Sequence, residues 1–297
     1  MYTDLAVFSG TDTVEETVAA IRLLCLPRGR VRIFVPEGQR DLDRERALMA
    51  KTAGAGVHIS LDSVDPKSAG ERVATEIAPG CETIVVVRPS GASLSLGVLE
   101  RLLLKHAPVP VWFWNTPGGS DLTIVAAVDP DDYDRRRDGL NMESVDLATD
   151  LALRGGGSVV LVNAWQLDDE YDMRQNPFVG TGDDKIETAR RALQAARASW
   201  LDTLAARCRR RGVAVEADLR EGPREAVIPA VVEERNASVL VVGTMKRRGF
   251  AAMVRPNTAT ALADGFSGSL TVVPPGRAET ESGGGSVSRI AAGVAFA

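Results

Sequence analysis

The chain has few of the residues that most enzymes use as nucleophiles, bases and metal ligands. Its 297 residues include only two histidines and three cysteines. The histidines are His58 and His106, and the widely separated cysteines are Cys25, Cys81 and Cys208. This scarcity argues against a serine or cysteine triad and against a histidine-rich metal site. An odd, scattered set of cysteines is typical of buried thiols in a reducing compartment.

Several sequence signals that define other protein classes are also missing. There is no Gly-x-x-x-x-Gly-Lys-[Ser/Thr] loop, no Gly-x-Gly-x-x-Gly after a strand and no Gly-x-Ser-x-Gly elbow. No apolar run approaches the ~18 residues that a membrane span needs, and the N-terminus does not resemble a secretory signal. The net charge of −5 gives no general attraction to nucleic acid or anionic lipid. We therefore expect a cytoplasmic protein with no membrane span and no nucleic-acid partner.

The sequence does contain a regular alternation of short apolar runs and amphipathic helical stretches, which indicates strands alternating with helices. In the first half, strands are expected at 5–8, 31–35, 57–61, 83–87 and 109–114, and helices at 13–26, 41–53, 67–78 and 94–106. The run 83–87 is apolar throughout, which is typical of a central parallel strand. Pro110 argues that the last of these strands lies at an edge or carries a bulge.

The same order recurs after a Pro/Gly-rich linker at 116–120. Strands are expected at 122–128, 158–164, 213–219, 239–242 and 269–273, and helices at 141–154, 184–211, 223–235 and 258–264. The apolar stripe of the longest helix comprises Ile186, Ala189, Leu193, Ala196, Trp200, Leu204 and Cys208. The fold class is therefore α/β, with two doubly wound, Rossmann-like parallel-sheet domains in tandem. We expect domains at 1–117 and 118–276, and a disordered Gly/Ser-rich tail at 277–297.

The most informative stretch is 238–258, SVLVVGTMKRRGFAAMVRPNT. An apolar strand ends at Gly243, a basic turn follows, and Asn257-Thr258 opens an expected helix. A strand, a glycine turn and a helix N-terminus form a common phosphate-binding arrangement, because backbone N–H groups point at the anion there. The sequence therefore predicts a phosphate cradle, or the descendant of one, at this position.

This stretch resembles the C-terminal signature of universal stress proteins, in the pattern Gly243-Thr-Met-x-Arg-x-Gly249-(x)7-Asn257-Thr258. The strand that ends at Asp129 resembles the family's first strand, whose terminal aspartate lies beside the nucleotide. The stretch 220–228 resembles the family's turn into its third helix. The resemblance covers 121–275 well, and over 1–117 it rests on the repeated pattern. The tandem layout is most similar to the two-domain, E-type members, so the resemblance implies two universal stress protein-like domains.

The resemblance implies an adenine-nucleotide site in the second domain. The residues it assigns to that site are Asp129, Ala164, Gly243, Thr244, Met245, Lys246, Arg247, Gly249, Asn257 and Thr258. Lys246 and Pro256 replace two glycines that let the backbone approach the phosphates, so a site for ATP would be weak. The four cations Lys246, Arg247, Arg248 and Arg255 would either hold an anion through their side chains or form a solvated turn. Both readings stay open.

The first domain departs further from the pattern. Arg88-Pro89 follows its fourth strand where the signature has glycine, and Ser9 or Gly10 stands at the aspartate position. We expect this half to have lost the nucleotide site. The resemblance also implies that the two domains pair through the strands 109–114 and 270–273 as an intramolecular pseudo-dimer. Whether the chain forms a further homodimer stays open.

The function that we expect is a non-enzymatic stress-response protein with a weakened ATP pocket in the second domain. The alternative is a scaffold that binds no nucleotide and acts through a protein or lipid partner. A slow ATPase is a third reading, for which Asp129 is the one candidate residue. The insertion 165–183 is either a lid over the second-domain site or a loop over the contact between domains. No metal site is expected at the acidic loop 129–134, and no other residue is assigned a catalytic role.

Overall fold

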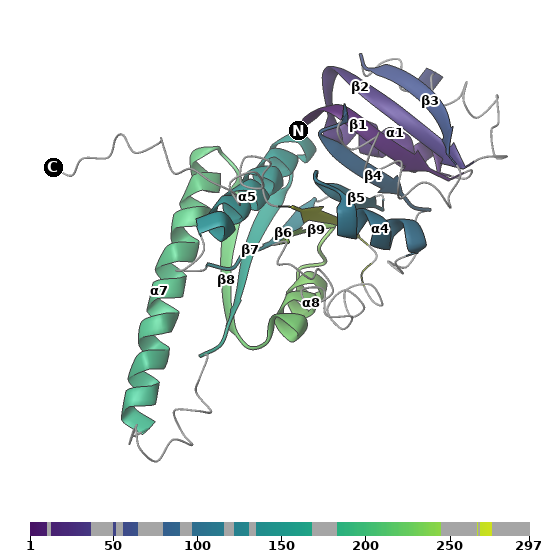
Figure 1. Cartoon of the computed structure of the whole chain (residues 1–297). Coiled ribbons are helices and arrows are strands. Elements are labelled where there is room, and N and C mark those ends of the chain that lie inside the picture. Colours follow the sequence, from purple (N-terminus) through teal and green to yellow (C-terminus); the bar gives the residue numbers. More distant parts are fainter. Residues whose placement is uncertain are drawn as a thin grey trace, which may run out of the picture.

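The computed structural model describes residues 1–10, 13–36, 50–51, 56–64, 80–89, 97–115, 122–130, 135–167, 183–244, 266 and 268–274 (Figure 1). Within these residues ten strands form one sheet in the order β3-β2-β1-β4-β5-β10-β9-β6-β7-β8. The expected helices 41–53, 67–78 and 258–264, most of the insertion 165–183, and the tail 277–297 lie wholly or largely outside the described residues.

The described elements follow the expected alternation closely. In the first half they are β1 (Tyr2–Ser9), α1 (Val14–Leu24), β2 (Cys25–Pro36), β3 (His58–Val64), β4 (Thr83–Val87), α4 (Val98–His106) and β5 (Val111–Trp114). In the second half they are β6 (Thr123–Ala127), α5 (Arg135–Gly155), β7 (Ser158–Trp165), α7 (Asp183–Arg210), β8 (Ala214–Glu221), α8 (Arg224–Glu234), β9 (Val239–Gly243) and β10 (Ser269–Val273). The α/β fold class is confirmed.

The sheet repeats one strand order in its two halves. From each outer edge inwards the order is β3-β2-β1-β4-β5 and β8-β7-β6-β9-β10, with parallel pairing inside each half. The halves join where β10 pairs with β5 in antiparallel fashion, with Thr271 opposite Trp112. The predicted pairing of the two terminal strands is therefore confirmed, and the carboxyl ends of the strands point in opposite directions in the two halves.

An apolar layer covers each face of the sheet. Successive side chains of a strand point to opposite faces, so strands that are covered on both sides carry apolar residues toward both layers. Residues of α1, α5 and α7 form one layer, together with Trp112 and Trp114. Residues of α4 and α8 form the other layer, together with Phe113. Trp112, Phe113 and Trp114 are among the largest fully buried side chains in the described part of the chain, so the junction of the two halves lies in the core.

Some predicted positions are wrong in informative ways. Pro110 precedes β5, and β5 pairs with both β4 and β10, so it is central rather than an edge strand. The helix α5 begins at Arg135, six residues before the predicted start, despite the low helix propensity of Gly139. On α7, Ala196 is exposed although its spacing placed it on the apolar stripe, because the deeply buried positions are concentrated in the C-terminal part, at residues such as Leu201 and Leu204.

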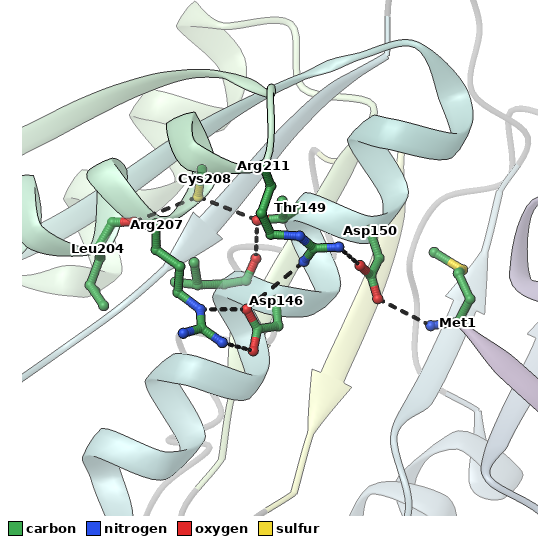
Figure 2. Close-up of polar contacts among 9 residues, drawn as sticks. Met1, Asp146, Thr149, Asp150, Leu204, Arg207, Cys208 and Arg211 are labelled. Carbon is green, nitrogen blue, oxygen red and sulfur yellow. Dashed lines mark hydrogen bonds and ion pairs between the residues drawn. The ribbon is translucent and has the colours of Figure 1, made fainter.

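The contact between α5 and α7 carries a compact polar network (Figure 2). Arg207 on α7 donates two hydrogen bonds of 2.7 Å to the carboxylate of Asp146 on α5. Arg211 pairs with Asp150, which also accepts a 3.3 Å contact from the α-amino group of Met1. Bidentate arginine–carboxylate pairs fix geometry more than they add stability at this degree of exposure. The network therefore sets the register of α7 on α5.

All three cysteines are buried and remain as thiols. Burial raises the pKa of Cys25 to about 11 and raises the pKa of Cys208 as well. We expect none of the three thiols to react with a thiol-specific dye in the folded protein at mildly alkaline pH, and all three to react in denaturant. Because burial favours the protonated thiol, Cys25 contributes to the free energy of unfolding fully below its ordinary pKa of 9.0. This contribution is lost as the pH rises through the raised pKa of about 11. One thiol that reacts at the rate of free cysteine would contradict this burial.

Within the described ranges, no helix is long and apolar enough to cross a membrane.

Candidate functional site

Four of the predicted nucleotide-contact residues meet at one edge of the sheet. Ala127 of β6 pairs with Val162 of β7 and with Val242 of β9, so the three strands end side by side. This places Asp129, just after β6, near Ala164 of β7 and near Gly243 and Thr244 at the end of β9. We call this place the second carboxyl edge. In open α/β sheets, ligands bind beyond the carboxyl ends of the strands, so the edge is where a ligand is expected.

Two asparagine side chains hold the backbone at this edge. The Asp129 N–H donates to Asn141 Oδ1 at 3.1 Å, and Asn141 Nδ2 donates to the Asp129 carbonyl at 2.8 Å. Asn163 Nδ2 donates to the Val128 carbonyl at 2.8 Å from a fully buried position. Since both amides use backbone atoms, they fix the path of the chain and leave the Asp129 carboxylate to other partners.

Three arginines from three different helices surround the Asp129 carboxylate, and we call them the arginine cluster. Arg137 on α5 donates to Asp129 Oδ2 at 2.7 Å, and Arg197 on α7 donates to Oδ1 at 3.3 Å. Arg224, the first residue of α8, has Nη1 4.0 Å from Oδ2. Arg197 also donates to the Pro130 carbonyl at 3.1 Å. The second carboxyl edge therefore brings guanidinium groups from three helices to one carboxylate.

Gly243 serves helix packing at this edge. A Cβ atom at position 243 would lie 2.6 Å from Cγ of Leu140 on α5, closer than real Cβ atoms come to their neighbours. Leu140 is buried, so it has little room to move. The φ angle of Gly243 lies outside the left-handed region, so its conformation does not require glycine. The close approach of α5 therefore explains this glycine without a ligand.

Thr244 continues the sheet beyond β9. Its N–H donates to the Val273 carbonyl at 2.8 Å. A phosphate cradle needs backbone N–H groups that point at the anion, and this one is used within the fold. The other predicted contacts, Met245, Lys246, Arg247, Gly249, Asn257 and Thr258, lie outside the described residues, as do the remaining cations Arg248 and Arg255.

The strand pairing identifies the equivalent positions in the first half and corrects one of them. Gly243 lies opposite Val273, as Val87 lies opposite Trp114, so Val87 rather than Arg88 stands at the glycine position. Arg88 is the counterpart of Thr244, and its N–H donates to the Trp114 carbonyl at 3.0 Å. The sequence alone could not fix this register because the two loops share no motif beyond their position.

The corresponding edge of the first half lies at the carboxyl ends of β1 and β4, and we call it the first carboxyl edge. It has no aspartate at the position of Asp129, and buried hydroxyl side chains pack there against one another. Val87 pairs with Ser9 of β1, which makes Gly10 the counterpart of Asp129. The Ser9 hydroxyl lies 3.0 Å from that of Thr13 and 2.8 Å from that of Thr17, and all three residues are buried. Among the residues that the structure describes, this edge therefore has neither a carboxylate at the position of Asp129 nor the cluster of cations found in the second half.

Arg88 itself is buried at the first edge. Its guanidinium lies 3.3 Å from the carboxylate of Glu100 and over the ring of Phe113, 5.7 Å from the ring centroid. Burial lowers the pKa of Arg88, while Glu100 opposes that shift. A buried guanidinium that is paired with a carboxylate does not present its charge to a ligand.

Sequence reasoning missed the residues that give the second edge its charge. Arg137 and Arg197 belong to no motif, and they meet Asp129 only because α5 and α7 pack on the same face. Arg224 lies in the stretch 220–228, at one of the positions that the resemblance leaves unassigned. Asn141 follows Asp129 by twelve residues, which is a spacing that no local rule connects. In the described part of the chain, no group of three or more histidine, cysteine, aspartate or glutamate residues could hold a metal ion.

Comparison with known proteins identifies one family. Residues 122–274 match the universal stress protein family. A comparison with curated proteins found no match.

Solved structures reproduce the tandem architecture. A putative universal stress protein from Pseudomonas aeruginosa UCBPP-PA14 is 21% identical, with a TM-score of 0.64 over 92% of this chain and 94% of that chain. A functionally unknown protein, PA1789 of Pseudomonas aeruginosa PAO1, is 19% identical, with a TM-score of 0.63 over 92% and 93%. A universal stress protein from Arabidopsis thaliana with AMP bound matches 55% of this chain and 97% of its own, at 16% identity and a TM-score of 0.35. The first two likenesses show the fold alone.

Proposed function

The chain belongs to the universal stress protein family, and we propose that it is a non-enzymatic, cytoplasmic stress-response protein whose second half binds an adenine nucleotide weakly. The observation that carries this proposal is the convergence of Asp129, Ala164, Gly243 and Thr244 at the second carboxyl edge, beside the arginine cluster. Clustered guanidinium groups at the carboxyl ends of parallel strands suit a phosphorylated ligand. We further propose domain boundaries at 1–117 and 118–276, followed by the tail 277–297.

Two features support weak rather than tight binding. The Thr244 N–H is already used by Val273, and Lys246 and Pro256 stand where the family signature has glycine. Phosphates would therefore depend on side chains, with Arg137, Arg197 and Arg224 as the described candidates. Long side chains lose rotamer freedom when they are ordered on a ligand, which lowers affinity relative to a preformed backbone cradle. ATP is the expected ligand because it carries the most phosphate charge of the common adenine nucleotides.

The same geometry also supports a second candidate function. Most of the described polar groups at the core of the site already have a partner in the chain: Asp129 pairs with arginines, and Thr244 pairs with Val273. The exception is Oδ1 of buried Asn163, which accepts no hydrogen bond from the described residues. A site largely satisfied from within can stand without a ligand, so a scaffold that binds a protein or lipid partner is the alternative. A slow ATPase has less support, because the Asp129 carboxylate is ion-paired with arginines rather than placed as a base for water.

Calorimetric titration of the full chain with ATP and Mg²⁺ tests the proposal. We expect saturable heat in the micromolar to millimolar range and no loss of ATP over hours. A matched titration of the Asn141→Ala variant, which loses both hydrogen bonds to the Asp129 backbone, should bind ATP more weakly because the edge is no longer held in place. The absence of heat at millimolar ATP, together with no nucleotide on the purified protein, would leave the scaffold as the function.

A further inference from the structure

Within the described residues, one carboxylate at the second carboxyl edge faces guanidinium groups from three helices. Asp129 is within 4.0 Å of the guanidinium groups of all three members of the arginine cluster. Among the residues that the structure describes, Arg197 and Arg224 meet no second carboxylate. By contrast, Arg220, at the end of β8, lies between the carboxylates of Asp218 and Glu234. Asp129 is therefore the one described carboxylate that Arg197 and Arg224 contact.

The cluster is held in place yet remains open to solvent. The exposed fraction of the side chain is 16% for Arg137, 23% for Arg197, 37% for Asp129 and 58% for Arg224. Partial burial removes some of the water that would otherwise screen these charges, so an anion placed among them is attracted more strongly than on an open surface. The exposure of Asp129 and Arg224 leaves a path for that anion.

The Asp129 carboxylate can leave the cluster without disturbing the backbone. Asn141 holds the N–H and carbonyl of Asp129, and Asn163 holds the carbonyl of Val128. None of these bonds involves the carboxylate. Rotation of the Asp129 side chain to another staggered rotamer would withdraw its carboxylate from Arg197 and Arg224 while the chain stays where the asparagines hold it.

We propose that the arginine cluster is the phosphate-binding site of the second half and that Asp129 is a built-in competitor for it. A phosphate group has three acceptor oxygens and up to two negative charges, so it satisfies several guanidinium groups better than one carboxylate does. Binding exchanges the Asp129 carboxylate for the phosphate, and the intramolecular carboxylate reduces the apparent affinity. This inference rests on the proposed function in one respect, namely that an anionic ligand reaches this edge.

The proposal reverses the role that the family resemblance implies for Asp129. If the aspartate lies beside the nucleotide and helps to hold it, its removal weakens binding. If it competes for the arginines, its removal strengthens binding. The two roles therefore predict opposite signs for the same substitution.

The test titrates inorganic tripolyphosphate, which carries no nucleoside, into the full-length chain at low and moderate salt. Asp129→Asn keeps the backbone bonds to Asn141 and should raise the affinity about tenfold, the scale of losing a charge-assisted contact. Arg197→Gln should lower the affinity by about the same factor. Arg191→Gln is the matched control, because Arg191 lies on the same helix, pairs with Glu187 and is 76% exposed. It should change the affinity by less than about twofold, and added salt should weaken binding by every form of the chain.

The outcomes separate this proposal from the proposed function. The proposed role of Asp129 as a competitor is overturned if the Asp129→Asn variant binds tripolyphosphate more weakly than the parent or equally well. It is also overturned if no form with a native circular dichroism spectrum binds tripolyphosphate. Binding of ATP without binding of tripolyphosphate also overturns it but leaves the nucleotide function standing. Tripolyphosphate binding that is strengthened by Asp129→Asn, with no preference for ATP over GTP, supports the arginine site and overturns the adenine assignment.

Discussion

Replacing Trp112 with alanine is expected to lower the free energy of unfolding by about 3–5 kcal/mol. Trp112 is fully buried in β5, opposite Thr271 of β10, at the one antiparallel pairing found among the described strands. Its ring lies 6.4 Å from that of Trp114, also buried, and both rings face the layer formed by α1, α5 and α7. Truncation would leave a cavity between the halves that these rigid helices cannot close.

Urea denaturation followed by circular dichroism measures this loss, and Trp200→Ala is the control. Trp200 is a tryptophan of the same layer but only half-buried, so its truncation should cost less than half as much. Because one continuous sheet runs through both halves, we expect a single transition for the parent chain. A Trp112→Ala variant within about 1 kcal/mol of the parent would show that the junction is not part of the core.

Replacing Gly243 with alanine is expected to destabilise the chain by about 1–3 kcal/mol through overpacking. The added Cβ would lie 2.6 Å from Cγ of Leu140, and its nearest Cδ would be 2.8 Å away. Leu140, on α5, is buried against the end of β9, so the clash must be relieved by moving a helix or a strand. Thermal or urea unfolding measures the effect.

A double-mutant cycle with Leu140→Ala assigns the cause. If the two side chains compete for one space, Gly243→Ala should cost at least about 0.5 kcal/mol less in the Leu140→Ala background than in the parent. The glycine would instead serve a ligand if Gly243→Ala left stability unchanged and abolished ATP binding. In that case the cycle would show no coupling between positions 140 and 243.

Most of the fold could be predicted because it depends on local patterns. The apolar run at Thr83–Val87 and the closing strand Ser269–Val273 were placed at their observed bounds, since β-branched runs flanked by turn residues leave little choice. The resemblance to universal stress proteins also predicted the joining of β5 to β10, which the structure confirms. Pro110 was misleading because a proline at the start of a strand fits a central position as well as an edge.

The charge of the candidate site could not be predicted, because tertiary packing creates it. Asp129 was identified from its place after a strand, which is local information. Arg137 and Arg197 are 8 and 68 residues away from it. Arg137 precedes the helix predicted at 141–154, and Arg197 lies within the helix predicted at 184–211. Gly243 was recognised by its motif, but its contact with Leu140 depends on how α5 crosses the sheet. Sequence patterns therefore located the edge and left its partners undetermined.

A crystal structure of the full chain grown with ATP tests the central claim most directly. We predict phosphate oxygens within hydrogen-bonding distance of Arg197 and Arg224, with the Asp129 carboxylate turned out of the arginine cluster. We predict no nucleotide at the first carboxyl edge, beside Gly10 and Arg88. A nucleotide bound at the first edge, or phosphates bound elsewhere while the contact between Asp129 and Arg197 stays intact, would contradict the account.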